Sequence, residues 1–319
     1  MYNYSIIIPH HNIPDLLERL LYSIPIRDDL EIIIVDDNSD PSIVDFDNFP
    51  GKDRQDTTIV FDKSGKGAGR ARNVGLERAK GKWFLFADAD DFFNYCIRDI
   101  LDEYQDEEAD IVFFNVTGMN SDSYNMSNRG LYIRNYHQLF EKDPQKALFH
   151  FRYDQGSPWA KLIKKELVDN NEIRFDETRI HNDTTFSYLV AYHANNFKVD
   201  HRALYCNTFR SNSISFTLNE DKILTRMDVL VRRDRFYLNH GIDLEQITVQ
   251  LHIESLVDLL AEGKIVLYDK CLKIFETYGF CQSDITKRIK AYKKMRLKKK
   301  IIAKLHYYFE RILKFVMRY

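Results

Sequence analysis

Cysteine is scarce in this chain, and its four cysteines form no pattern. Cys96, Cys206, Cys271 and Cys281 lie far apart or in unrelated contexts, without the spacing of a metal site. A disulfide-stabilised secreted fold and a cysteine metal site are therefore not expected. The cysteines are predicted to be reduced thiols of a cytoplasmic protein.

Long apolar runs are also missing. No uninterrupted apolar stretch approaches the roughly 18 residues that a membrane-spanning helix needs. The N-terminal stretch enters a strand by Ser5 and has no basic region followed by a long apolar run, so no signal peptide is expected. The 319 residues, 44% of them hydrophobic, suffice for one large domain or two moderate ones with packed cores.

The charge is nearly balanced but unevenly distributed. The chain has 46 basic and 48 acidic residues, a net charge of −2. Residues 287–319 hold thirteen Lys or Arg and one acidic residue, Glu310, so the rest has 33 basic and 47 acidic residues, or −14. Apolar residues recur at helical spacing in 287–319, which predicts a basic amphipathic helix on an anionic membrane surface. Packing of its apolar stripe on the preceding helices is the alternative. Nucleic acid is not an expected partner, because no recognisable binding module accompanies the charge.

Apolar strands alternate with helical patterns in the first part of the chain. Buried strands are predicted at residues 4–9, 31–35, 57–61, 83–87 and 110–114. This alternation predicts an α/β fold with a mostly parallel, Rossmann-like sheet flanked by helices. From Glu220 onward the pattern is helical. We therefore expect an α/β domain over residues 1–215 and a helical extension over residues 216–319.

Three carboxylates follow the strand at residues 83–87, namely Asp88, Asp90 and Asp91. In open α/β sheets, ligands bind outside the carboxyl ends of the strands. Clustered carboxylates repel one another, and a bound divalent cation that prefers oxygen ligands usually offsets this repulsion. Asp88 and Asp90 are therefore predicted to hold a metal ion and a phosphorylated ligand, although a solvated turn at the strand end is the simpler alternative.

Two other strand ends carry candidate binding residues. Asp37, after the strand at 31–35, is suited to accept hydrogen bonds from the edge of a base. After the strand at 57–61, a glycine-rich loop containing Gly69 allows close backbone approach, and a helix predicted to start near Arg70 points its positive end at this loop. With Arg70 and Arg72, the loop is a predicted diphosphate site. A dinucleotide-binding fingerprint is the alternative, but arginine occupies its third glycine position.

Asp183 lies near the start of another predicted helix. An acidic residue there is favoured by the helix dipole alone. As a functional residue it would be a general base, if the fold brings it within reach of a substrate hydroxyl. Arg210, in a loop rich in Ser and Asn, is either a phosphate-binding residue or an ordinary surface residue.

Together these pieces resemble the family 2 glycosyltransferases, which have the GT-A fold. The matching segments are Ile6–Pro9 with Asn12, 31–39, 69–73, 81–91, 159–161, 174–176, 182–186 and 205–215. They follow the family's order over the first 215 residues. The ordered set is far more specific than any one segment.

The resemblance implies a role for each matched residue. Asp37 would contact the nucleotide base, and Pro9, Gly69 and Arg72 would line the nucleotide. Asp88 and Asp90 would form the DXD motif, in which Asp88 would touch the ribose or the metal and Asp90 would bind Mg²⁺ or Mn²⁺ bridging the diphosphate.

Asp183 matches the base of the inverting family members. The family usually has Glu before this Asp, whereas this chain has Asn182. A third protein ligand for the metal is not identifiable, and His181, His193 and His201 are only candidates.

The implied activity is metal-dependent, inverting transfer of a sugar from a nucleotide-sugar, expected to be a UDP-sugar, to a hydroxyl of a lipid-linked glycan. The setting would be surface polysaccharide synthesis at the inner face of a bacterial plasma membrane. The metal and the arginines would neutralise the charge of the diphosphate leaving group. A glycosidase with two catalytic carboxylates is less consistent with the sequence, because its mechanism does not require these arginines. A catalytically inactive nucleotide-sugar-binding or membrane-adaptor protein is the alternative, and homo-oligomerisation stays open.

Overall fold

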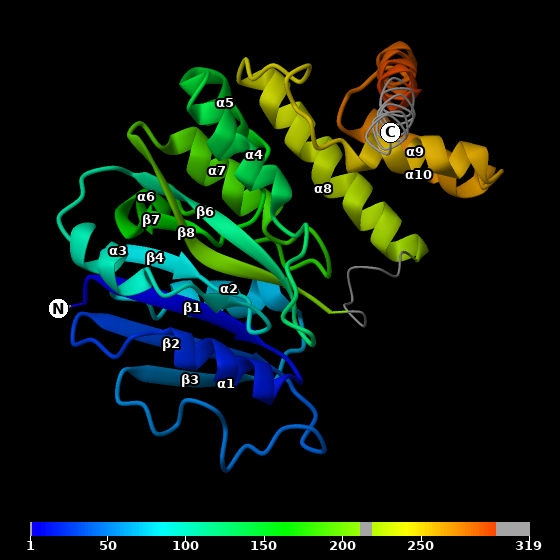
Figure 1. Ribbon diagram of the computed structural model, residues 1–319. Helices are drawn as coiled ribbons and strands as arrows, with labels where there is room; N and C mark the ends of the chain where they lie inside the picture. The colour runs from blue at the N-terminus through cyan, green and yellow to red at the C-terminus, as the bar shows by residue number, and fades with distance from the viewer. Residues whose placement is uncertain (1, 211–218, 298–319) are drawn as a thin grey trace, which may run out of the picture. The chain divides into compact units, whose positions relative to one another are not determined.

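The computed structural model describes residues 2–210 and 219–297 (Figure 1). The chain divides into two compact units, Met1–Leu218 and Asn219–Tyr319, each with its own hydrophobic core. The expected domain boundary between residues 215 and 216 lies outside the described residues, as does the part of the basic segment from 298 to 319.

The first unit is built on one eight-stranded sheet. Its strands are β1 (Tyr4–His10), β2 (Leu30–Asp37), β3 (Thr57–Asp62), β4 (Trp83–Phe86), β5 (Phe92–Phe93), β6 (Ile111–Asn120), β7 (Lys161–Lys164) and β8 (Phe197–Phe209). They lie in the order β3-β2-β1-β4-β7-β6-β8-β5. The neighbours from β3 to β4 are parallel, as are β6 and β8, whereas β7 is antiparallel to β4 and β6, and β5 is antiparallel to β8. The sheet is therefore mixed.

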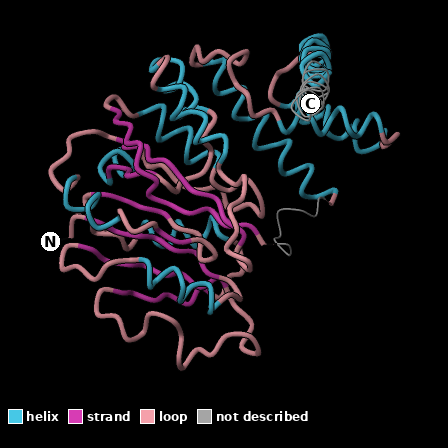
Figure 2. The backbone as a smooth tube through the Cα atoms, in the orientation of Figure 1, coloured by secondary structure: helices cyan, strands magenta, loops and turns pink. Residues whose placement is uncertain are grey.

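Helices lie alongside this single layer of strands (Figure 2). They are α1 (Pro14–Ser23), α2 (Ala68–Leu76), α3 (Ile97–Glu103), α4 (Leu131–Phe140), α5 (Pro144–Tyr153), α6 (Lys165–Asn170) and α7 (Thr184–His193). α1 begins at Pro14, whose missing N–H costs nothing at the first helical position. Its buried face, with Leu17, Leu20 and Leu21, belongs to the core of this unit.

The parallel strands bring three chain segments together at the carboxyl ends of β1, β2 and β4. β1 pairs with β2 as far as His10 and Asp36, and β4 pairs with β1 as far as Phe86 and Ile7. The next amide, that of Ala87, still donates to the carbonyl of Ile7 at 3.2 Å. The residues after β1, β2 and β4 therefore emerge side by side.

The second unit is helical over its described residues. It contains α8 (Glu220–Asn239), α9 (Leu251–Ala261), α10 (Ile265–Thr277) and a further helical stretch at 282–297. Met227, Leu256 and Phe275 are fully buried in its core. The predicted helical extension is thus confirmed as far as the described residues reach. Among the helices at residues 2–210 and 219–297, none has the length and apolar character required to cross a bilayer.

Candidate functional site

The turn after β4 presents two accessible carboxylates and one buried carboxylate. The side chains of Asp88 and Asp90 are 32% and 28% exposed, whereas Asp91 is 1% exposed. Asp91 accepts hydrogen bonds from the Thr208 amide at 2.6 Å and from Asn207 Nδ2 at 3.1 Å. Burial and the charges of Asp90 and Asp88 raise the pKa of Asp91 well above its usual range. Asp91 thus fastens the turn to β8, whereas Asp88 and Asp90 remain partly accessible.

Arg72 connects this turn to the start of α7. Its side chain is buried; Nη2 donates to Asp88 Oδ1 at 2.5 Å and Nη1 donates to Asn182 Oδ1 at 2.7 Å. The guanidinium also lies 5.4 Å from the centroid of the Phe175 ring. One side chain from α2 therefore joins the carboxyl end of β4 to the residue before Asp183.

Asp183 occupies the N-cap position of α7, but its side chain makes no capping hydrogen bond. Burial raises the pKa of Asp183, the positive charge of Arg72 opposes this increase, and the charge of Asp88 adds to it. Because Arg72 bonds both Asp88 and Asn182, the residue before Asp183, the start of α7 lies next to the turn after β4. A carboxylate with a raised pKa at this point has the properties of a general base.

Asp90 is paired with Arg210 at the end of β8. Arg210 Nη2 and Nε lie 2.8 and 3.2 Å from Asp90 Oδ2. The Asp90 carbonyl accepts from Arg19 Nη2 at 2.5 Å and from Thr208 Oγ1 at 2.7 Å. Burial and the nearby charge of Asp88 raise the pKa of Asp90. A divalent cation between Asp88 and Asp90 would relieve this repulsion.

Asp37 lies at the end of β2, next to the glycine-rich loop. Its Oδ2 accepts from the Gly67 amide at 2.9 Å, and its Oδ1 is buried without a hydrogen-bond partner among the described residues. Burial raises the pKa of this carboxyl. A buried acceptor without a donor is an unusual feature in a folded protein, and it fits the predicted contact with a base edge.

A buried pair of His10 and Asp36, which the sequence did not indicate, joins β1 to β2. His10 Nδ1 lies 2.8 Å from Asp36 Oδ2, and both side chains are fully buried. The Ile13 amide donates to His10 Nε2 at 3.2 Å, so Nδ1 carries the proton and donates to Asp36. The preceding residue, Pro9, is buried in β1. The pair therefore fixes the start of the loop after β1 next to the end of β2, where Asp37 lies.

Gly69 lies in the first turn of α2 and is buried. A Cβ atom there would lie 1.9 Å from the Asp176 carbonyl oxygen and 2.9 Å from Asn182 Cβ. The missing side chain therefore lets α2 pack directly against the segment that leads to Asp183. The close backbone approach at Gly69 is made by the chain itself, and contact of Gly69 with a nucleotide stays a prediction.

Lys161, to which the sequence assigned no role, is buried at the start of β7. Its Nζ donates to the carbonyls of Gln155 and Ser157 at 2.9 and 2.8 Å. Burial lowers the pKa of Lys161 to about 7, and the charge of Asp183 opposes this shift. The two hydrogen bonds of Nζ thus fix the loop before β7.

Several residues around the site have backbone conformations that sequence patterns do not reveal. Asn12, Asn38, Ala160 and His181 all have φ between 55° and 58°. Such conformations are uncommon for residues other than glycine and gather where a fold positions functional groups. They lie beside the ends of β1 and β2, before β7, and before Asp183.

The three candidate histidines add no recognisable metal ligand. His193 is in the last turn of α7, and His201 Nδ1 lies 3.4 Å from His137 Nδ1. Over residues 2–210 and 219–297, no three His, Cys, Asp or Glu side chains form a potential metal site. Any metal at Asp88 and Asp90 would need oxygens from a ligand or water to complete its coordination.

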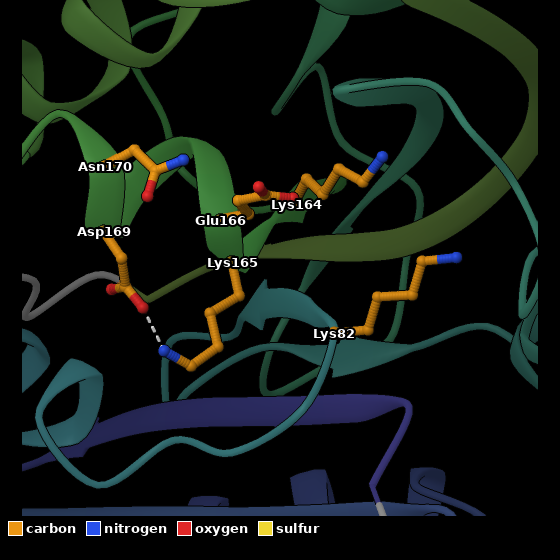
Figure 3. A pocket seen from close by; sticks show the side chains of 6 residues that line it. All are labelled: Lys82, Lys164, Lys165, Glu166, Asp169 and Asn170. Atoms are coloured by element: carbon orange, nitrogen blue, oxygen red, sulfur yellow. Dashed lines mark hydrogen bonds and ion pairs between the residues drawn. The ribbon is translucent and has the colours of Figure 1, made fainter.

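A separate hollow of about 350 Å³ lies at the opposite end of β4 (Figure 3). Lys82, just before β4, and Lys164, opposite Trp83 in β7, extend beside it. Their amines contact the Gln105 carbonyl and Glu108 at 3.3 and 3.4 Å, and Lys165 is bound to Asp169. These lysines already have partners, and the hollow does not belong to the carboxylate site.

Comparison with known proteins identifies the family of this chain. The family model described as "Glycosyl transferase family 2" matches residues 5–166. A cholesterol galactosyltransferase of Borreliella burgdorferi is 24% identical over 90% of this chain and 91% of its own length. The glycosyltransferase GlyG of Streptococcus pneumoniae is 27% identical over 73% of this chain and 84% of its own.

A solved structure shares the fold. TarS of S. aureus, crystallised in complex with UDP-GlcNAc, has a TM-score of 0.55 at 19% identity, covering 87% of this chain and 91% of that chain. This likeness confirms the predicted GT-A class of the first unit, with helices after it. Because the family model spans half of the sequence and relatives named as glycosyltransferases align along most of it, the chain belongs to glycosyl transferase family 2 and is a glycosyltransferase.

Proposed function

We propose that this enzyme transfers a sugar from a UDP-sugar to a hydroxyl of a lipid-linked glycan, with inversion at the anomeric carbon. The observation that carries the proposal is the double contact of Arg72 with Asp88 and Asn182. It joins a carboxylate pair suited to a metal-bound diphosphate to a carboxylate suited to be a base. The UDP-GlcNAc bound by TarS supports a UDP-sugar as donor.

Asp88 and Asp90 have the properties that Mg²⁺ or Mn²⁺ needs. Both offer hard oxygen ligands, each is about one-third exposed, and each has one oxygen held by an arginine. Mg²⁺ is typically bound by one or two carboxylates together with substrate phosphates. The metal would neutralise charge that develops on the diphosphate leaving group.

The protein's own groups would divide the remaining work. Arg72 and Arg210 would donate hydrogen bonds to phosphate oxygens, and Asp37 would accept a hydrogen bond from the base. Asp183 Oδ would take the proton of the acceptor hydroxyl as its oxygen forms a bond to the anomeric carbon and the bond from that carbon to the diphosphate breaks. Attack from the face opposite the leaving group inverts the anomeric centre.

Product formation from a panel of UDP-sugars tests the proposal. Activity should require Mn²⁺ or Mg²⁺, vanish with EDTA, and fall by about 10²-fold or more with Asp90→Ala and with Asp183→Asn. Asp169→Asn, an exposed change on α6, should leave the activity intact. Full transfer by the Asp90 and Asp183 variants would end this assignment of roles.

The acceptor and the membrane contact form a second part of the proposal. The basic segment 287–319 would hold the enzyme on the anionic inner face of the plasma membrane, where a lipid-linked acceptor is found. The change of Lys298, Lys299 and Lys300 to Gln should weaken co-sedimentation with phosphatidylglycerol vesicles and leave binding to phosphatidylcholine vesicles unchanged. Equal vesicle binding by the wild type and this variant would contradict the membrane role.

A further inference from the structure

A large hollow on the first unit lies away from the residues assigned to catalysis. It has a volume of about 810 Å³ and lies between α1, the residues that follow it, and the connection from β2 to β3. Pockets that bind ligands usually measure about 300–1,000 Å³. The hollow is thus large enough to take several side chains of a partner.

Apolar side chains are unusually exposed around it. Tyr22, Ile26 and Ile43 are 82%, 78% and 53% exposed, and all three line the hollow. Single exposed apolar residues are ordinary on protein surfaces, but a group around one hollow marks an interaction site. A partner that covers this surface should offer apolar side chains.

The same hollow is acidic. Asp15, Glu18, Asp45 and Asp53 line it. Arg54 lines it too, but Nε and Nη2 bind Asp56 at 3.0 and 2.8 Å. Its positive charge is therefore already matched. An anionic membrane and a nucleic acid would be repelled, so the partner should be both apolar and basic.

The chain itself contains such a segment. Residues 298–319 include seven basic residues and one acidic residue, a net charge of +6. The basic residues are Lys298, Lys299, Lys300, Lys304, Arg311, Lys314 and Arg318. Apolar residues, among them Ile301, Leu305, Phe309 and Ile312, recur between them at helical spacing. Composition and charge both complement the hollow.

We propose that the hollow binds residues 298–319 of a second copy of the chain, with apolar side chains against Tyr22, Ile26 and Ile43 and basic side chains beside the four acidic residues. A reciprocal exchange of the segment fills both hollows and closes a twofold dimer. The inference does not depend on which sugar is transferred. It assigns the basic segment a protein partner in addition to lipid.

Sedimentation equilibrium of the full chain with charge-swapped variants tests this dimer. The wild type should be a dimer at low salt and dissociate at high salt, because the Debye length falls from about 10 Å at 0.1 M to about 3 Å at 1 M. Glu18→Lys with Asp53→Lys, or Lys299→Glu with Lys300→Glu, should each raise the dimer Kd by about tenfold or more. All four changes together should restore it.

The control is Glu166→Lys with Asp169→Lys, which makes the same charge change at exposed positions on α6 and should leave the Kd unaltered. Circular dichroism of each variant reports whether it is folded. The proposal is overturned if the wild type is a monomer at low salt, if the combined variant fails to recover, or if the segment variant loses vesicle binding while its dimer persists.

Discussion

Replacement of Arg72 by Met should affect stability, turnover and pH dependence together. The change keeps an apolar stem near Phe175 but removes the charge-assisted hydrogen bond to Asp88 and the hydrogen bond to Asn182. A hydrogen bond to a charged group contributes about 1.5–3 kcal/mol and a neutral one about 0.5–1.5 kcal/mol. Because Asp88 is 32% exposed and water can partly replace its partner, we expect a loss near the lower end, about 2–3 kcal/mol in the free energy of unfolding.

Arg72→Met should lower kcat by more than its effect on the free energy of unfolding would explain. A donor aimed at developing charge typically contributes about 10²–10³ in kcat. The positive charge of Arg72 also opposes the increase in the pKa of Asp183, whereas the charge of Asp88 adds to it. Without Arg72 the pKa of Asp183 rises further, so the base stays protonated to a higher pH. The acidic limb of the kcat profile should move to higher pH.

Initial rates with saturating donor across a pH series, together with urea unfolding, measure these effects. Arg78→Met is the matched control, because Arg78 follows the same helix and contacts only the Val74 carbonyl and Glu77 among the described residues. This control should retain the wild-type profile. A variant lacking Arg72 with an unshifted acidic limb and unchanged stability would refute the reasoning.

Three further predictions follow from the site. Asp183→Asn should lower kcat by about 10²–10⁴ and leave UDP binding measurable by calorimetry, and wild-type kcat should fall as pH decreases through a pKa that burial places above the usual range of Asp. Gly69→Ala should destabilise the fold by about 1–3 kcal/mol through the clash with the Asp176 carbonyl, whereas Gly156→Ala, with no atom within 4 Å, should be nearly neutral in urea unfolding. Burial lowers the pKa of Lys161 from 10.5 to about 7, so the native state binds one proton fewer than the unfolded state between these pH values. The free energy of unfolding of the wild type should then rise by about 1.4 kcal/mol per pH unit relative to Lys161→Met, and a pH-independent difference would contradict this.

The sequence predicted most of the first half of the fold because its signals there are local. The continuous apolar runs of β1, β2 and β4 are typical of strands covered on both faces, and they are buried throughout. α1 also carries local signals, because it begins at a proline and its leucines recur at helical spacing. The start of α7 beside Asp183 was also predicted.

Long-range pairings could not be read in the same way. β7 has four residues and lies antiparallel between β4 and β6, and nothing in Lys161–Lys164 encodes that placement. Arg210 and Asp90 are 120 residues apart, and Arg72 and Asn182 are 110 apart. Gly69 shows the same limit. A glycine that allows a ligand to approach the backbone cannot be told in a sequence from one that allows another segment of the chain to approach it.

Asn182 changes what Arg72 can offer to a ligand. A Glu at this position would give the guanidinium a second anionic hydrogen-bond partner, whereas with Asn182 the one carboxylate that it bonds among the described residues is that of Asp88. Arg210 likewise pairs only with Asp90 among the described residues. If the proposed divalent cation were held by these two carboxylates, both guanidinium groups would lose these salt-bridge partners where the diphosphate of the proposed donor would lie. Under the proposed function, donor binding would then exchange two arginine–carboxylate pairs for arginine–phosphate contacts, and the arginines would be positioned before the nucleotide arrives.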